Sequence, residues 1–168
     1  VVDWIDADSD IAGFGGAEDA YYLSRPKPYR AANQPMQQVE ELYRIYGFDA
    51  KVIARLRPLV TTLPVRTAIN ANTAPEAVLA AVFPDVPTAA IAAFAADRLA
   101  KPARSREEAV QRLGSKAAGA GVNAIDVKSG WFEVTVTVAQ DDVRLATDAL
   151  VRRADNGASA IIWRRPRF

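Results

Sequence analysis

The sequence predicts an α+β protein, in which a run of helices is followed by an antiparallel sheet. Residues 35–113 carry apolar side chains at helical spacing together with two capping-box patterns, whereas residues 131–168 alternate between two faces as strands do. Residues 1–34 show neither period and are rich in glycine and acidic side chains. Helices and strands that are segregated along the chain are typical of α+β folds rather than of alternating α/β folds.

The composition excludes several classes of functional site. The 168 residues carry a formal net charge of +1 and half of them are apolar, which is a globular composition without a long-range attraction to nucleic acid or membrane. The chain has no cysteine and no histidine, so disulfides, thiolate or imidazole metal ligands and Ser-His-Asp triads are excluded. Its paired carboxylates stand in a glycine-rich loop without a nucleophile, and we expect no enzymatic activity.

The loop predicted at residues 1–34 gives the sharpest chemical signal. Its acidic side chains all precede the first basic residue, Arg25. The predicted metal ligands are Asp3, Asp6, Asp8, Asp10, Glu18 and Asp19. Hard carboxylate oxygens gathered in one loop suit calcium, and their mutual repulsion favours a bound cation. A solvated acidic loop without a metal is the alternative.

The spacing Asp6-x-Asp8-x-Asp10 matches the first three ligands of an EF-hand loop, but the rest of that pattern fails. Ile11 stands where the EF-hand requires glycine. Ala17 stands where it requires glutamate, and Glu18 follows one place late. No helix signal leads into the loop either. The sequence therefore predicts a calcium site of another kind, completed by backbone carbonyls.

The first two predicted helices lie between residues 36 and 57. Apolar side chains from Met36 to Tyr46 fall near helical spacing, and Gly47 supplies a C-terminal stop. A second helix is expected over residues 50–57, because Pro58 cannot continue it.

Two capping boxes place the later helices. The segment Thr73-Ala74-Pro75-Glu76 predicts a helix start with proline in its first turn, and this helix continues to about Phe83. Two prolines then separate it from a helix that begins near Thr88. The segment Ser105-Arg106-Glu107-Glu108 predicts the start of a further helix, which Gly114 ends.

A second chemical signal precedes the first of these capping boxes. The stretch Ile69-Asn70-Ala71-Asn72-Thr73 is similar to the entry of helix-hairpin-helix modules, which hold a DNA phosphate on the free amides of a glycine-rich turn. The corresponding turn, Phe83-Pro84-Asp85-Val86-Pro87, has no glycine, lacks two N–H groups and adds a carboxylate. We favour the interpretation that Asn70 and Asn72 hydrogen-bond a turn and cap a helix. A nucleic-acid-binding protein stays an alternative.

Residues 131–168 predict a three-stranded antiparallel meander. Side chains from Trp131 to Val138 alternate between two faces, and further strands are expected over 143–153 and 159–165. The segment Asp155-Asn156-Gly157 predicts a hairpin turn between the last two strands. A small meander needs a cover for its apolar face, which either the helices or a segment absent from this sequence could supply.

Short motifs spread over the chain form an ordered set. They are Asp3-Trp4-Ile5-Asp6, Gly16-Ala17-Glu18-Asp19-x-Tyr21-Tyr22, Pro28-Tyr29-Arg30-Ala31-Ala32-Asn33-Gln34-Pro35, Glu40-Glu41-Leu42, Leu56-x-Pro58-Leu59-Val60-Thr61, Leu63-Pro64 and Ile69-Asn70-Ala71-Asn72-Thr73-Ala74. Together they resemble the signature of the minor pseudopilins of type II secretion known as general secretion pathway protein K. Several separated motifs in the right order are far more specific than any single one.

The resemblance implies a pilin-like fold, in which a long N-terminal helix precedes an antiparallel sheet and a large all-helical domain is inserted between the strands. The N-terminal helix and the first part of the pilin core would then be missing from this sequence. Residues 1–34 would be a pilin-domain loop with the calcium site, residues 35–118 the inserted helical domain, and residues 119–168 the returning sheet. The implied calcium site carries over only the acids of the first two motifs, and Asp8 and Asp10 rest on spacing alone.

The same resemblance implies a structural function. By this resemblance, the protein is expected to cap the tip of the pseudopilus, on the periplasmic face of the bacterial inner membrane. The cap would start pseudopilus assembly for protein export across the outer membrane. The expected partners are the I and J minor pseudopilins and exported proteins, with no nucleic acid and with membrane contact only through the missing helix. A calcium-dependent interaction module unrelated to secretion is the remaining alternative.

Overall fold

The structure, a computed structural model, describes residues 1–167 and divides into two units, Val1–Thr67 and Ala68–Phe168. Each unit has a hydrophobic core of its own, and the two are described separately below. Among the helices of residues 1–167, none is long and apolar enough to cross a lipid bilayer.

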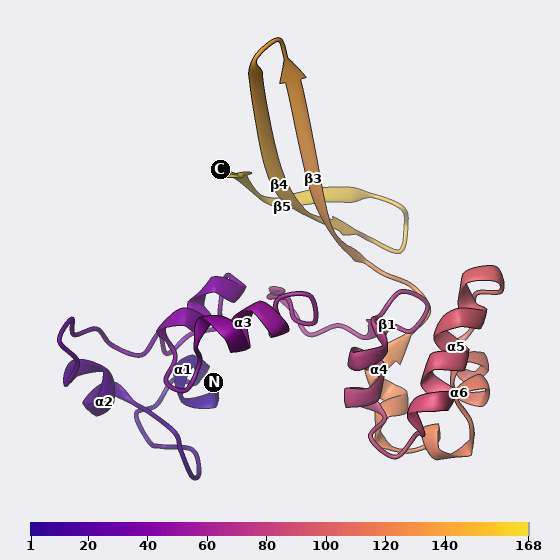
Figure 1. Ribbon diagram of the computed structural model, residues 1–168, viewed down its shortest axis with the longest axis horizontal. Helices are drawn as coiled ribbons and strands as arrows, with labels where there is room; N and C mark the ends of the chain where they lie inside the picture. The colour runs from indigo at the N-terminus through magenta and orange to yellow at the C-terminus, as the bar shows by residue number, and fades with distance from the viewer. Residues whose placement is uncertain (168) are drawn as a thin grey trace. The chain divides into compact units, whose positions relative to one another are not determined.

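The first unit is built from short helical segments around an aromatic core. They are α1 (Val2–Ile5), α2 (Asp19–Leu23), the 3-10 helix η1 (Val39–Arg44) and α3 (Ala50–Leu56), joined by long loops (Figure 1). Trp4, Tyr22, Leu42 and Ile53 are buried, and the rings of Trp4 and Tyr22 meet edge to face with centroids 5.3 Å apart. The acidic loop and the helices that follow it therefore share one core.

Two expectations for this unit need correction. The acidic segment is not wholly irregular, because α1 and α2 form within it. The helix expected from Met36 to Tyr46 is shortened to η1, whose capping box pairs Gln38 with Glu41. It ends at Ile45, since this buried residue adopts an extended backbone. The helix expected over 50–57 is confirmed as α3, and it begins after an Asp49 cap.

The helical part of the second unit packs around an aliphatic core. It contains α4 (Glu76–Val82), α5 (Thr88–Ala100), α6 (Arg106–Leu113) and the 3-10 helices η2 (Ser115–Ala117) and η3 (Ala120–Ala124). The most deeply buried side chains of this core include Leu79, Ile91, Leu113 and Ile125. The helices that carry or surround them are shown in Figure 1. A parallel pair of two-residue strands, β1 (Ile69–Asn70) and β2 (Ile125–Asp126), joins the start of this part to its end. Strands this short carry no periodicity that sequence reasoning could detect.

The two predicted capping boxes have different outcomes. Ser105 accepts a hydrogen bond from the Glu108 N–H at 3.2 Å, so α6 starts as predicted, and Gly114 ends it with a φ of 97°. The prediction for Thr73 is wrong, because α4 starts after Pro75 without a side-chain cap. The Thr73 hydroxyl instead faces the Asn70 carbonyl at 3.5 Å within a turn.

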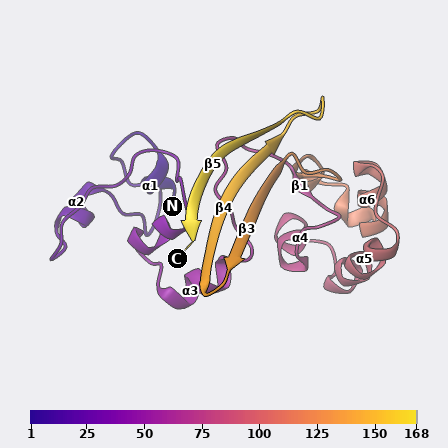
Figure 2. The ribbon, with the colours of Figure 1, turned by 90° about the horizontal axis from the view of Figure 1, so that it is seen from above.

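The sheet is a three-stranded antiparallel meander, as predicted. Its strands are β3 (Trp131–Gln140), β4 (Val143–Arg153) and β5 (Ser159–Arg167), in the order β3-β4-β5 (Figures 1 and 2). Gly157 has a φ of 83° at the predicted hairpin turn. Phe132, Val134, Val136 and Val138 alternate onto one face and are exposed. The apolar face of the meander is therefore open to a cover.

The two units do not coincide with the division into 1–34, 35–118 and 119–168. The chain divides after Thr67, because residues 35–56 are held to the acidic loop by the shared aromatic core. A mixed protein with an antiparallel sheet is confirmed. The pilin-like assignment of the three segments, the insertion of a helical domain and the missing N-terminal helix stay predictions.

Candidate metal centre

The buried Asp3 carboxylate holds part of the acidic loop in place by hydrogen bonds to its backbone. Its side chain lies on α1 and is only 4% exposed. One carboxylate oxygen accepts the Ala12 N–H at 3.1 Å and the other accepts the Ala17 N–H at 2.7 Å, so the carboxylate ties the two ends of segment 12–17 together. A Cβ at Gly16 would overlap the Asp3 carboxylate and lie 2.6 Å from the Ile11 side chain. The loop therefore requires glycine at position 16.

Glu18 follows this segment and is buried without a partner. It is 3% exposed, yet neither of its carboxylate oxygens has a hydrogen-bond partner. Burial, then the negative charges of Asp3 and Asp6, raise the pKa of Glu18. The nearby backbone of Asp19 offsets part of that shift, and Asp8 adds slightly to it. A buried carboxylate in this state is destabilising unless it takes up a proton or meets a cation.

Two further side-chain oxygens beside the loop lack partners in the same way. Asp6 Oδ1 and Asn33 Oδ1 are both buried and unpaired. Asn33 is tied to the loop because its N–H donates to the Trp4 carbonyl at 3.0 Å and its side-chain amide donates to the Asp8 carbonyl at 3.3 Å. Within residues 1–167, every buried side-chain oxygen without a hydrogen-bond partner belongs to Asp6, Glu18 or Asn33.

The remaining predicted ligands are engaged differently. Asp8 and Asp10 are exposed, and Asp8 Oδ1 accepts the Asp10 N–H at 2.9 Å, as in an Asx turn. Asp19 forms an ion pair with Arg30 at 2.8 Å and accepts the Ala31 N–H at 2.9 Å. Each Asp19 oxygen therefore already has a partner, as each Asp3 oxygen does, and the Asp19 charge is also paired with a cation.

The unpaired oxygens of the acidic loop fit a hard cation, although the side chains do not converge into a complete coordination site. In the described part of the chain, residues 1–167, no three His, Cys, Asp or Glu side chains converge closely enough to hold a metal ion. The unpaired buried atoms at the acidic loop are nevertheless oxygens, from two carboxylates and one amide, and such oxygens are calcium ligands. Calcium stays a prediction. Asn33 was missed as a candidate because an uncharged amide adds nothing to an acidic pattern.

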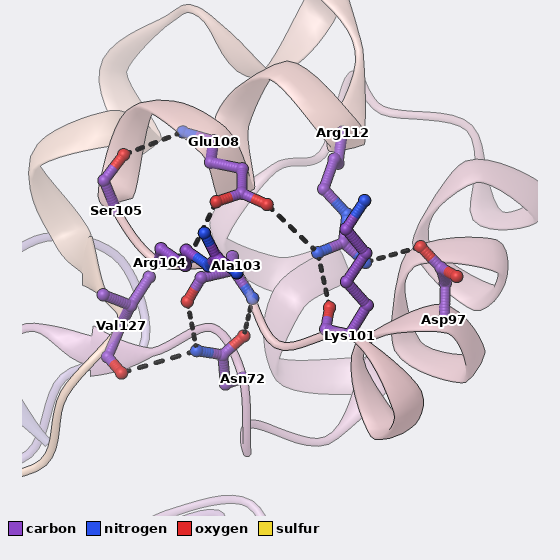
Figure 3. A network of polar contacts seen from close by, with 9 residues as sticks. All are labelled: Asn72, Asp97, Lys101, Ala103, Arg104, Ser105, Glu108, Arg112 and Val127. Atoms are coloured by element: carbon purple, nitrogen blue, oxygen red, sulfur yellow. Dashed lines mark hydrogen bonds and ion pairs between the residues drawn. The ribbon is translucent and has the colours of Figure 1, made fainter.

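Asn70 and Asn72, in the second unit, form hydrogen bonds that hold a turn and a loop. Asn70 Oδ1 accepts the Asn72 N–H at 3.0 Å, which confirms the predicted turn. The Asn72 side chain does not cap a helix. Its amide nitrogen donates to the carbonyls of Ala103 and Val127, and its amide oxygen accepts the Ala103 N–H (Figure 3).

The turn between α4 and α5 presents little to a phosphate. The Phe83 N–H donates to the Leu79 carbonyl and the Val86 N–H donates to the Phe83 carbonyl, so both amides are used within the hairpin. Pro84 and Pro87 have no N–H at all. No observation here favours the nucleic-acid alternative.

Comparisons with known proteins agree with one another. Family models described as type II secretion system (T2SS), protein K, match residues 1–65 and 69–128. The type II secretion system protein K of Pectobacterium carotovorum subsp. carotovorum is 36% identical over 149 residues, which cover 84% of this chain and 45% of that protein. Its counterpart in Pseudomonas aeruginosa is 32% identical over 164 residues, which cover 98% of this chain and 49% of that protein.

The structural comparison also covers almost the whole chain. The chain matches a crystal structure of the GspK-GspI-GspJ complex from the type 2 secretion system of enterotoxigenic Escherichia coli with a TM-score of 0.84 and 26% identity. This match covers 99% of this chain and 60% of the other. The chain spans about half the length of the curated relatives it matches, at 45% and 49%.

Proposed function

This chain belongs to the protein K family of the type II secretion system, and we propose that it forms part of a minor pseudopilin at the tip of the pseudopilus. There it joins the I and J minor pseudopilins, starts pseudopilus assembly and supports protein export across the outer membrane. The observation that carries this proposal is the match of nearly the whole chain, at a TM-score of 0.84, to a structure of a GspK-GspI-GspJ complex.

The side-chain inventory supports a structural rather than a catalytic role. The sequence has no histidine or cysteine to act as a base or nucleophile. Glu18, whose pKa is raised by burial, lies among other carboxylates and not beside a group that it could activate. Exported proteins are further partners in this proposal, and nucleic acid is not.

The open face of the sheet supports the pilin-like part of the proposal. Val134, Val136 and Val138 are 40%, 53% and 59% exposed and belong to one face. An apolar sheet face of this kind is stable in water only when another element packs on it. In this proposal the N-terminal helix of the full-length pilin-like protein covers it. That helix anchors the protein in the inner membrane and leaves the described residues in the periplasm.

Calcium in the acidic loop is part of the same proposal. Asp6, Glu18 and Asn33 supply unpaired buried oxygens, and the carboxylates of Asp3 and Asp8 add negative charge beside Glu18. A calcium ion bound there would neutralise this repulsion and hold the loop against the aromatic core. Its role would be to stabilise the fold, as a disulfide does in other small domains.

The assembly role predicts a stable three-subunit complex. Full-length protein that is produced together with the I and J minor pseudopilins of the same secretion system is expected to elute with both in one peak of size-exclusion chromatography. The mass by light scattering should correspond to one copy of each subunit. If I and J form a pair while this protein elutes alone at the same concentration, the proposed assembly role is wrong.

A further inference from the structure

The first unit contains an aromatic cleft that the metal proposal does not use. Its volume is about 360 Å³, which is enough for one or two side chains of a bound chain. The rings of Tyr21, Tyr29, Tyr43 and Tyr46 contribute to its lining. Tyr43 and Tyr46 are about half exposed, so their rings are accessible from solvent.

Contacts within its own walls hold the cleft in shape. The Tyr29 hydroxyl donates to the Arg44 carbonyl at 2.7 Å, which connects the wall at residues 21–29 to the wall at residues 43–49. The rings of Tyr21 and Tyr46 pack across the same junction with centroids 4.7 Å apart. A cleft that is formed before binding loses little conformational entropy when a ligand arrives.

The charged groups of the lining favour an anionic ligand. The lining contains two cationic side chains, Arg25 and Arg44, and one carboxylate, Asp49. Asp49 already accepts the Val52 N–H at 2.8 Å as the cap of α3, whereas within residues 1–167 the Arg44 guanidinium makes no hydrogen bond or ion pair. A free guanidinium in a cleft lined by tyrosines is suited to a carboxylate, which it can bind through two parallel hydrogen bonds.

We infer that this cleft binds an extended acidic peptide segment of a partner protein. The tyrosine rings receive an aromatic or proline side chain of the segment, and Arg44 pairs with an acidic one. Aromatic-lined grooves bind extended peptides in this manner, and tyrosine and arginine are the side chains enriched where protein contacts are strongest.

The chemistry of the lining indicates a transient partner. Permanent subunit interfaces resemble a protein core and are largely apolar, whereas this cleft exposes hydroxyl and guanidinium groups that remain hydrated when it is empty. The inference rests on the cleft alone and goes beyond the proposed assembly with I and J.

Peptide binding to the full chain tests the inference. The probe is the synthetic peptide acetyl-Glu-Glu-Phe-Pro-Glu-Glu-amide, and the matched control peptide carries lysine in place of each glutamate. In titrations followed by amide chemical shifts, the acidic peptide is expected to shift residues 21–29 and 43–49 with a dissociation constant of about 1 mM or lower. Absence of saturable shifts, or equal shifts with the lysine peptide, overturns the inference.

Two charge-reversal variants locate the binding. Arg44→Glu is expected to weaken binding of the acidic peptide by about tenfold or more, because the ionic contact is replaced by repulsion. Its fold should persist, since only the Arg44 backbone carbonyl takes part in the Tyr29 contact. Arg55→Glu makes the same change at an exposed position of α3 and should leave binding within about twofold. Equal losses in both variants would mean nonspecific charge attraction. The co-elution experiment with I and J is unaffected by either result.

Discussion

Changing Glu18 to glutamine is expected to abolish the stabilisation of this protein by calcium and to stabilise its metal-free form at neutral pH. Glu18 is 3% exposed, and both of its oxygens lack hydrogen-bond partners. Calcium at about 100 times its dissociation constant should add about 2.7 kcal/mol to the free energy of unfolding of the unchanged protein, and nothing to that of the variant. Without calcium, the variant gains because it buries no charge beside Asp3 and Asp6.

The pH dependence follows from the direction of the Glu18 pKa shift. The pKa in the folded state is raised, so the folded chain binds this proton more tightly than the unfolded chain does. In a chelator, the Glu18 contribution to stability is therefore fully present below the unfolded-state pKa and is lost as the pH rises through the folded-state pKa. Calcium requires the carboxylate form, so calcium stabilisation should grow over the same pH interval. Glu18→Gln should lack both trends.

Thermal unfolding by circular dichroism, in excess calcium, excess magnesium and chelator, measures these effects. Asp85→Asn removes one acidic charge in the turn between α4 and α5 and serves as the matched control, with an unchanged calcium response expected. Asp10→Asn tests the EF-hand-like spacing, because Asp10 is exposed in the structure. A calcium response that survives Glu18→Gln but disappears with Asp10→Asn would place the ion on the exposed side of the loop. If the unchanged protein shows no calcium response, the calcium proposal is wrong and the loop is a solvated acidic loop without a metal.

Helix ends, strands and turns in this chain were predictable where the neighbouring residues alone determine them. The strand expected over residues 143–153 and the Asn156-Gly157 turn match β4 and the hairpin after it, because both depend on neighbouring residues. Ser105 and Gly114 placed the two ends of α6 for the same reason. Thr73 carried an equally good capping pattern and failed, since its hydroxyl bonds to the Asn70 carbonyl in a turn and α4 begins only after Pro75.

The candidate metal centre was only partly predictable, because burial decides it. Spacing alone emphasised Asp6, Asp8 and Asp10, of which the last two are exposed. Glu18 differs from them because Asp3, on α1, accepts the Ala17 N–H and holds the segment before Glu18 against the buried part of the unit. A contact between residues this far apart has no signature in spacing or composition.

Asn72 gives the largest expected effect in the helical part of the second unit. Asn72→Ala removes the acceptor of the Ala103 N–H at 2.8 Å and the donor to the Ala103 carbonyl at 2.9 Å, together with the weaker contact to Val127 (Figure 3). Ala103 is 4% exposed, so its amide would be left buried without a partner. We expect a loss of about 2–4 kcal/mol in the free energy of unfolding, measured by urea denaturation.

Asn123→Ala makes the same chemical change at an exposed position of η3 and should stay within about 0.5 kcal/mol of the unchanged protein. Hydrogen exchange separates a local effect from a global one. Because Asn72 holds the connection between α5 and α6, the Ala103 amide should lose protection first, before the amides of α4. If Asn72→Ala and Asn123→Ala are equally mild, Asn72 does not secure this connection, and the apolar core around Leu79 and Ile125 suffices to hold the helices together.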